Sequence, residues 1–176
     1  NNRGILINDG TSVTSVTGAI DITGIGGGGF ADSDSNDGVQ VDGVIQSTGS
    51  ATIDIEGTGG ISANHDDFNF GISLGSATAL ITSLNGNINL MGTGGGTLTA
   101  ASANNDGIRI DTAGATISST GTATITLTGG GGNADDSNRG IRLLEGTVVT
   151  SATGDITLTG TGGGTGVLDN SNRNIG

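Results

Sequence analysis

Oxygen-bearing side chains gather in a short acidic segment that returns five times along the chain, and they are its best candidates for chemistry. The first copy, Asp32-Ser33-Asp34-Ser35-Asn36, alternates these side chains in the order found in calcium-binding loops, although the usual Glu is missing. Calcium takes six to eight oxygen ligands, and stacked copies could supply them. Asp32, Asp34 and Asn36 are therefore candidate calcium ligands, and solvated turns closed by side-chain hydrogen bonds are the alternative.

No catalytic arrangement of residues accompanies these segments. His65 is the only histidine, and no nucleophile recurs at a fixed distance from it. The repeated Gly-x-Gly-Gly steps resemble phosphate-binding loops, but such loops need the N-terminus of a helix after the glycines, and no helix is indicated. We therefore expect a non-enzymatic protein without catalytic or cofactor-binding residues. It should require no cofactor, and calcium is the one candidate for a bound ion.

The charge of the chain limits its partners. Five basic residues, all arginine, stand against 17 acidic ones, which gives a formal charge of −12. This balance argues against binding to nucleic acid or to anionic membrane surfaces, and no apolar run reaches the roughly 18 residues of a membrane-spanning helix. Arg3 and Asp37 share one position of the repeat described below, as do Asp106 and Arg139, so we expect salt bridges between neighbouring repeats at the surface.

The acidic segments belong to a repeat that covers the whole chain. An Asn-x-Gly step followed by aliphatic-x-aliphatic reads NRGILI, NDGVQV, NFGISL, NDGIRI and NRGIRL, and residues 172–175 are interpreted as a partial sixth copy. Successive glycine positions lie 34, 33, 36, 33 and 34 residues apart, a period typical of repeat arrays. Residues 1–176 form one domain, and its repeats run approximately over 4–37, 38–70, 71–106, 107–139 and 140–173.

Each repeat contains three stretches in which inward residues alternate with polar ones, the pattern of a strand with one buried face. In the second repeat the inward pairs are Val39/Val41, Ile45/Ser47 and Ile53/Ile55, and every other repeat has their equivalents. No stretch shows the helical period of 3.6 residues. The pattern predicts an all-β parallel β-solenoid of five coils, with three short strands per coil. A right-handed winding follows from the general preference of parallel crossover connections.

Two recurring features are assigned to the turns of the solenoid. The Asn of each Asn-x-Gly step should form a ladder, because Asn tolerates left-handed backbone and its amide can hydrogen-bond from coil to coil. The predicted members of this ladder are Asn2, Asn36, Asn69, Asn105, Asn138 and Asn172. The Gly-x-Gly-Gly corners, the first of which begins at Gly24, should supply positive φ angles where a Cβ would clash.

The order Gly-[Ile/Val]-x-[Ile/Leu], [Val/Ile]-x-Ser, Ile-x-[Ile/Leu]-x-Gly-x-Gly-Gly resembles the β-strand repeats of very large bacterial surface proteins, above all at Thr147–Gly164. Those repeats are related to filamentous-haemagglutinin-like adhesins. The resemblance implies an exported β-helical shaft at the cell surface or outside the cell, and we predict a structural or fibre-forming function. The alternative is a carbohydrate-binding or carbohydrate-active β-helix, for which Phe30, Phe68 and Phe70 are the only aromatic side chains.

Both ends of the repeat array should favour association with another solenoid end. Residues 1–4 and 171–174 are interpreted as lying in the same phase of the repeat, with neither a capping helix nor a polar final coil. Unpaired backbone groups and a cross-section of aliphatic side chains at each end would favour edge-to-edge pairing. We therefore expect head-to-tail self-association into a fibre, or continuation into a longer solenoid.

Overall fold

The computed structural model describes residues 1–28, 34–61, 67–96, 103–133, 136–164 and 175–176. These residues form fifteen short β-strands, which recur in groups of three along the chain. Strands dominate because β-branched residues alternate with polar ones and fit a half-buried pleated surface. No helix among the described residues is long and apolar enough to span a membrane.

The strands assemble into three parallel sheets, each built from one strand of every repeat. Sheet A contains β1 (Ile5–Ile7), β4 (Val39–Val41), β7 (Ile72–Leu74), β10 (Ile108–Ile110) and β13 (Ile141–Leu143). Sheet B contains β2 (Ser12–Ser15), β5 (Val44–Ser47), β8 (Leu80–Ser83), β11 (Thr116–Ser119) and β14 (Val148–Ser151). Sheet C contains β3 (Ile20–Ile25), β6 (Ile53–Thr58), β9 (Ile88–Thr93), β12 (Ile125–Gly130) and β15 (Ile156–Thr161).

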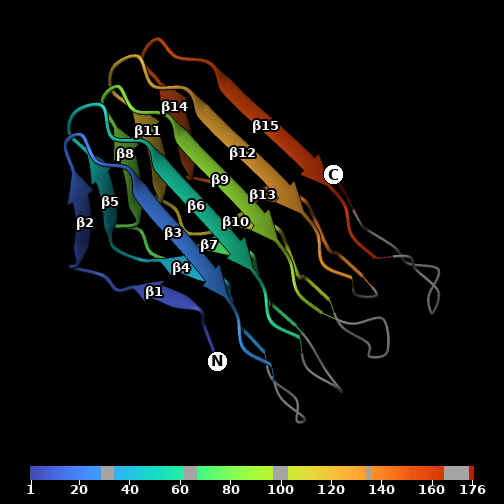
Figure 1. The fold of residues 1–176 in the computed structure, drawn as a ribbon. Coiled ribbons are helices and arrows are strands. Elements are labelled where there is room, and N and C mark those ends of the chain that lie inside the picture. The colour runs from blue at the N-terminus through green and yellow to red at the C-terminus, as the bar shows by residue number, and fades with distance from the viewer. Residues whose placement is uncertain (29–33, 62–66, 97–102, 134–135, 165–174) are drawn as a thin grey trace.

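The chain visits sheets A, B and C in turn and returns to A one strand further along the stack (Figure 1). Neighbouring strands pair in register, so that Val39 lies beside Ile72 and Ile72 beside Ile108. The predicted parallel β-solenoid is therefore confirmed, with about four turns and three sheets of five strands. Strands β1 and β15 lie at opposite ends of the stack, so the solenoid has two distinct ends (Figure 1).

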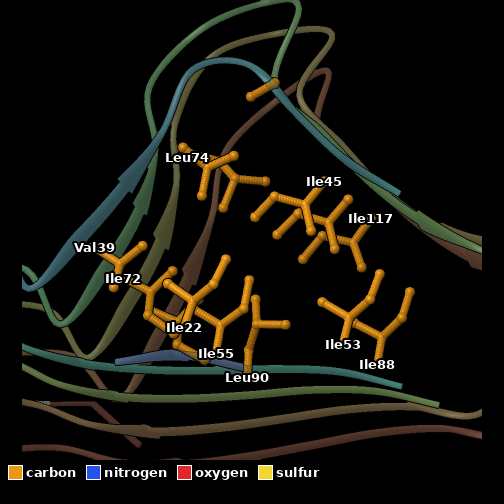
Figure 2. Close-up of a cluster of buried hydrophobic side chains, with 14 of the residues drawn as sticks. Ile22, Val39, Ile45, Ile53, Ile55, Ile72, Leu74, Ile88, Leu90 and Ile117 are labelled. Carbon is orange, nitrogen blue, oxygen red and sulfur yellow. The ribbon is translucent and has the colours of Figure 1, made fainter. Parts of the chain in front are cut away.

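The interior is filled by columns of aliphatic side chains from the three sheets. Figure 2 shows Val39 and Ile72 of sheet A, Ile45 and Ile117 of sheet B, and Ile53 of sheet C pointing into this shared core. All five side chains are fully buried. Because the same residue type recurs at each level, every side chain packs on a near-identical neighbour above and below it.

The Gly-x-Gly-Gly corners differ from the sequence-based expectation. The first glycine of each corner does not have a positive φ angle; among the described glycines that property belongs to Gly10, Gly96, Gly114, Gly146 and Gly164. Glycine is required instead because the chain leaving sheet C meets the chain approaching sheet A, backbone against backbone. A Cβ on Gly92 would lie 2.1 Å from the carbonyl oxygen of Gly107. The expected clash is present, but the expected φ angle was wrong.

The structure places the sixth copy of the motif two residues later in the chain than the sequence pattern suggested. The Gly107 N–H donates to the Arg139 carbonyl at 2.9 Å, and in the same way the Gly140 N–H donates to the carbonyl of Ile175 at 3.0 Å. Gly176 also lies against Gly160 as Gly140 lies against Gly129. Ile175 and Gly176 therefore take the last two positions of the motif, and Gly176 lies 36 residues from Gly140, like the step from Gly71 to Gly107. The predicted ladder member Asn172 lies outside the described residues.

Candidate functional site

The corner between sheets C and A carries a ladder of buried Asn side chains. The Oδ1 atom of each Asn accepts a hydrogen bond from the backbone N–H of the Asn in the preceding repeat. These bonds measure 2.8 Å from Asn2 to Asn36, from Asn36 to Asn69 and from Asn69 to Asn105, and 3.0 Å from Asn105 to Asn138. The side-chain amides therefore hydrogen-bond from coil to coil, as the sequence suggested, and in these bonds the donors are backbone groups.

Left-handed backbone occurs one residue before the ladder rather than in it. The φ angles of Ser35, Phe68, Asn104 and Ser137 lie between 57° and 60°. An L-residue adopts this conformation only at a steric cost, and here four equivalent residues share it. The tolerance for left-handed backbone that we ascribed to the ladder Asn is therefore used at the neighbouring position.

Aspartates of the acidic segments also bond along the stack. Oδ1 of Asp34 accepts the N–H of Asp67 at 3.1 Å, and Oδ1 of Asp67 accepts the N–H of Ala103 at 2.6 Å. Three residues further along each repeat, Asp37 accepts the N–H of Phe70 at 3.1 Å, and Asp106 accepts that of Arg139 at 3.0 Å. These segments therefore tie successive turns together.

The candidate calcium ligands are placed only in part. Asp32 lies outside the described residues, as does His65. Asp34 and Asn36 are placed, but an oxygen of each accepts a backbone hydrogen bond in the ladders just described. Within the described ranges, no group of three or more His, Cys, Asp or Glu residues is positioned to hold a metal ion. Calcium binding stays a prediction.

A charged cluster lies beside these ladders, and we call it the corner cluster. Its members are Arg3, Asp37, Phe68, Phe70, Asp106, Arg109, Arg139 and Arg142. The two predicted salt bridges are present, with 3.7 Å between Arg3 Nε and Asp37 Oδ2, and 3.6 Å between Arg139 Nη1 and Asp106 Oδ1. The carboxylates of Asp37 and Asp106 are buried, not at the surface as the sequence suggested.

Burial changes the acid–base behaviour of both carboxylates. Removal from water raises the pKa of Asp37 from 3.8 to about 6, although the Phe70 N–H and the charge of Arg3 act in the opposite direction. Burial likewise raises the pKa of Asp106, against a hydrogen bond from the Arg139 N–H and the charges of three arginines. A buried carboxylate loses more hydration than its partners restore, so the protonated form gains in relative stability.

Aromatic rings pack against Arg109 in the same cluster. The guanidinium carbon of Arg109 lies 4.6 Å from the centre of the Phe70 ring and 6.0 Å from that of Phe68. The two rings meet edge to face, with their centres 6.4 Å apart. Phe70 is buried and Phe68 is exposed, so only Phe68 offers surface to a ligand. Phe30, the third predicted aromatic, lies outside the described residues.

A second candidate surface is the outer face of sheet C. A groove of about 430 Å³ runs across β3, β6, β9 and β12, and its walls include Asp21, Asp54, Glu56, Asn89 and Met91. Asn89 donates from Nδ2 to Asp54 Oδ1 at 2.7 Å. The face changes from carboxylates on β3 and β6 to Thr126 and Thr128 on β12, so its acidic character is confined to one half.

The two ends of the solenoid expose different surfaces. In β15 the inward residues Ile156 and Leu158 are 40% and 44% exposed, whereas their equivalents in β12 are fully buried. In β3 the equivalent Ile20 is only 7% exposed. In sheet C, β15 therefore exposes its apolar core side chains to solvent while those of β3 are covered; in sheet B of the first turn, Val13 is 37% exposed.

No family model matches the chain. No curated protein and no solved structure matches it either. The resemblance to bacterial surface repeats therefore depends on the motifs of the sequence alone.

Proposed function

We propose that the chain is a non-enzymatic shaft or fibre-forming segment of a bacterial surface protein of the filamentous-haemagglutinin-like adhesin type, located at the cell surface or outside the cell. One observation carries this proposal: core columns, glycine corners and hydrogen-bonded ladders continue from turn to turn without interruption. Among the described residues, no turn adds a catalytic arrangement of its own. A uniform stack of this kind is better suited to forming a long, stiff structural element than to catalysing a reaction.

The proposal includes the finer architecture expected from the sequence. We infer five coils, one for each repeat, wound in the right-handed sense that parallel crossovers prefer. With coils spaced like neighbouring strands, at roughly 4.8 Å, the stack would be about 24 Å long.

We infer that copies associate end to end, or that the solenoid continues in the same manner. The inward residues of β13, β14 and β15 match those of β1, β2 and β3 position by position. A second copy docked in register would place Ile141 on Ile5, Val149 on Val13, Ile156 on Ile20, Leu158 on Ile22 and Gly160 on Gly24. Each pair repeats a contact already made between turns inside the chain, so the exposed apolar surface of β15 would be covered.

The last two residues limit how a second copy could dock in this register. Ile175 and Gly176 already take the positions that an Arg-Gly or Asp-Gly step holds in the other turns. In a docked copy these are the positions of Arg3 and Gly4, so the two segments would have to rearrange before β1 of the second copy could pair with β13. A head-to-tail contact of this kind does not close on itself, so it extends into a filament.

A charge placed on the exposed β15 core tests this association. Leu158→Asp should shift the sedimentation of the protein to that of a monomer, because a carboxylate would be buried in the proposed junction. Met91→Asp is the matched control, since Met91 is equally exposed but lies on the outer face of sheet C. Association that survives Leu158→Asp, in a variant with unchanged circular dichroism, would contradict the proposed junction.

The groove on sheet C favours carbohydrate binding as a second candidate function. Its carboxylates and the Asn89 amide can accept and donate hydrogen bonds to sugar hydroxyls, and Met91 offers an apolar wall. Neutral oligosaccharides suit it best, because its walls are acidic. Titration calorimetry with neutral glucans and xylans should then show binding that Asp54→Asn weakens. Breakdown of uronic-acid polymers by the isolated chain would overturn the non-enzymatic proposal altogether.

Calcium is retained as a proposal for the acidic segments. Bound Ca²⁺ would stabilise the folded state by mass action, so millimolar Ca²⁺ should raise the melting temperature. The double variant Asp32→Ala with Asp34→Ala should lose most of that rise. An unchanged calorimetric transition in millimolar Ca²⁺ would remove calcium from the account.

A further inference from the structure

Positive charge is concentrated at one place in an acidic protein. Arg3, Arg109, Arg139 and Arg142 all belong to the corner cluster, within a chain of formal charge −12. Three of them, Arg109, Arg139 and Arg142, lie around β10 and β13, where Asp106 and Asp111 are their ion-pair partners. Three cations here have two ion-paired carboxylates, and the charge of Arg109 also acts on Asp37.

The guanidinium groups at this end have hydrogen-bonding capacity that the protein does not use. Arg109 and Arg142 are direct neighbours in the register of sheet A, so two like charges lie side by side. Arg142 Nη1 is 3.9 Å from Asp106 Oδ2, too far for a hydrogen bond. Among the described residues, Nη1 of Arg109 is buried without a hydrogen-bond partner, whereas the Arg142 side chain is 28% exposed and open to water or a ligand.

The electrostatic state of Arg142 is consistent with a missing anion. Burial lowers the pKa of Arg142, and the neighbouring charges of Arg109 and Arg139 lower it further. Buried polar groups in native proteins are nearly always satisfied, and at this end of the cluster Nη1 of Arg109 and Oδ2 of Asp106 are the exceptions among the described residues. An oxyanion would relieve the repulsion between the arginines and accept their free N–H groups.

The overall charge limits what the partner is. A polyanion would carry most of its charges over the acidic remainder of the surface and be repelled there. A single carboxylate or phosphate group matches the planar, two-pronged donor geometry of a guanidinium. The exposed ring of Phe68, 6.0 Å from the Arg109 guanidinium, adds apolar surface for the rest of a small molecule.

We propose that Arg139 and Arg142, positioned by Arg109, bind one oxyanionic group of a small ligand at the β10–β13 end of the corner cluster. The site is built by strand register, because β10 and β13 bring the arginines of two repeats together. It shares no residue with the groove on sheet C, and although β13 also belongs to the proposed end-to-end junction, arginine resonances and sedimentation test the two proposals separately.

Nuclear magnetic resonance of the arginine side chains tests the proposal with two probes, sodium glucuronate for a carboxylate and inorganic phosphate. Saturable shifts of the Arg139 and Arg142 Nε–H signals are expected with at least one probe, beyond those caused by sodium chloride at equal ionic strength. The probe that binds identifies the type of oxyanion. Shifts no larger than those in sodium chloride, for both probes, would overturn the proposal.

Two variants make the test specific. Arg142→Gln should weaken binding about tenfold, the loss expected for a charge-assisted contact, whereas Arg142→Lys should weaken it less because the charge remains. Arg3→Gln is the matched control, because Arg3 belongs to the same cluster but lies beside Asp37 at the opposite end. Equal affinity in wild type and in a folded Arg142→Gln variant would contradict the assignment, as would an equal loss in Arg3→Gln.

Discussion

At the scale of single residues, the buried Asn side chains carry hydrogen bonds along the solenoid axis. Asn69→Ala removes the Oδ1 acceptor of the Asn36 N–H, which lies 2.8 Å away in a fully buried corner. A buried donor left without a partner costs about 1–3 kcal/mol, so we expect the free energy of unfolding to fall by that amount. Urea denaturation followed by circular dichroism measures the change.

The matched control for this prediction is Asn89→Ala. Asn89 also bonds to the neighbouring turn, through Asp54, but it does so on the exposed face of sheet C where water can replace the partner. Its loss should change the free energy of unfolding by no more than about 0.5 kcal/mol. If Asn69→Ala and Asn89→Ala lowered the free energy of unfolding equally, the burial of the ladder would add nothing to stability.

Asp37 predicts an unusual dependence of stability on pH. Its pKa is about 6 in the folded protein against an ordinary 3.8, so the folded state binds a proton between these values that the unfolded state releases. Stability should therefore rise as the pH falls from about 6 to 4, by on the order of 3 kcal/mol from this group. The raised pKa of Asp106 acts in the same direction.

Chemical denaturation at pH 4 and pH 7 checks this dependence. In Asp37→Asn the gain on acidification should shrink, because the variant has no proton to bind at this position. Asp155→Asn makes the same charge change at an exposed residue and should retain the gain. A wild-type protein that loses stability steadily from pH 7 to pH 4 would show that the buried carboxylates are not destabilised in their charged form.

The sequence predicted which residues recur at the corners, but it did not predict whether they are buried or which groups they bond to. The recurring positions of Asn36 and Asn69, and the opposite charges of Arg3 and Asp37, follow from the repeat spacing alone. The burial of Asp37 and the use of backbone donors in the ladder could not be predicted, because no periodicity reports how the acidic segment folds against its neighbours. The left-handed residue before each Asn varies in type among Ser, Phe and Asn, so it leaves no signal in the sequence.

At the scale of elements, the corner glycines allow the end of sheet C to meet the start of sheet A. An added methyl group on Gly92 would lie 2.1 Å from the Gly107 carbonyl oxygen, which is backbone and cannot turn away. Gly92→Ala should therefore lower the free energy of unfolding by about 3 kcal/mol or more. Thermal and urea denaturation measure the loss.

Gly130→Ala is the control in the same sheet. Nothing lies within 4 Å of a Cβ at Gly130, and its φ angle is not positive. This change should be neutral or should stabilise the fold by up to about 1 kcal/mol through the unfolded chain. A similar effect of both substitutions would show that glycine is needed for flexibility rather than for close approach.

The strands themselves could be predicted from the sequence, because a buried face imposes a period of two on every repeat. Each predicted inward pair, such as Val39/Val41, falls within a strand of the structure. The sixth motif was misplaced by two residues because Asn172 and Asn174 both suit its first position. Segments between sheets C and A differ in length from repeat to repeat, so spacing alone could not choose between them.

At the scale of the whole molecule, the two ends determine whether the solenoid stays alone. Uniform columns mean that the surface exposed by β15 is the one that every inner turn covers with its successor. The difference between the ends could not be predicted, because residue types are the same at both and only the packing of side chains along the axis distinguishes them. In the proposed filament, this difference would give the fibre a direction and would favour head-to-tail over tail-to-tail contact.

Electron microscopy of the purified chain at high concentration tests directly whether copies associate end to end into filaments. If copies stack end to end, we expect unbranched filaments one solenoid wide. Their axial repeat should be about 24 Å, which is five strand spacings of roughly 4.8 Å. The filaments should be absent in Leu158→Asp and present in Met91→Asp. Dispersed single particles in the wild-type sample, or filaments that grow sideways through sheet C, would contradict end-to-end association.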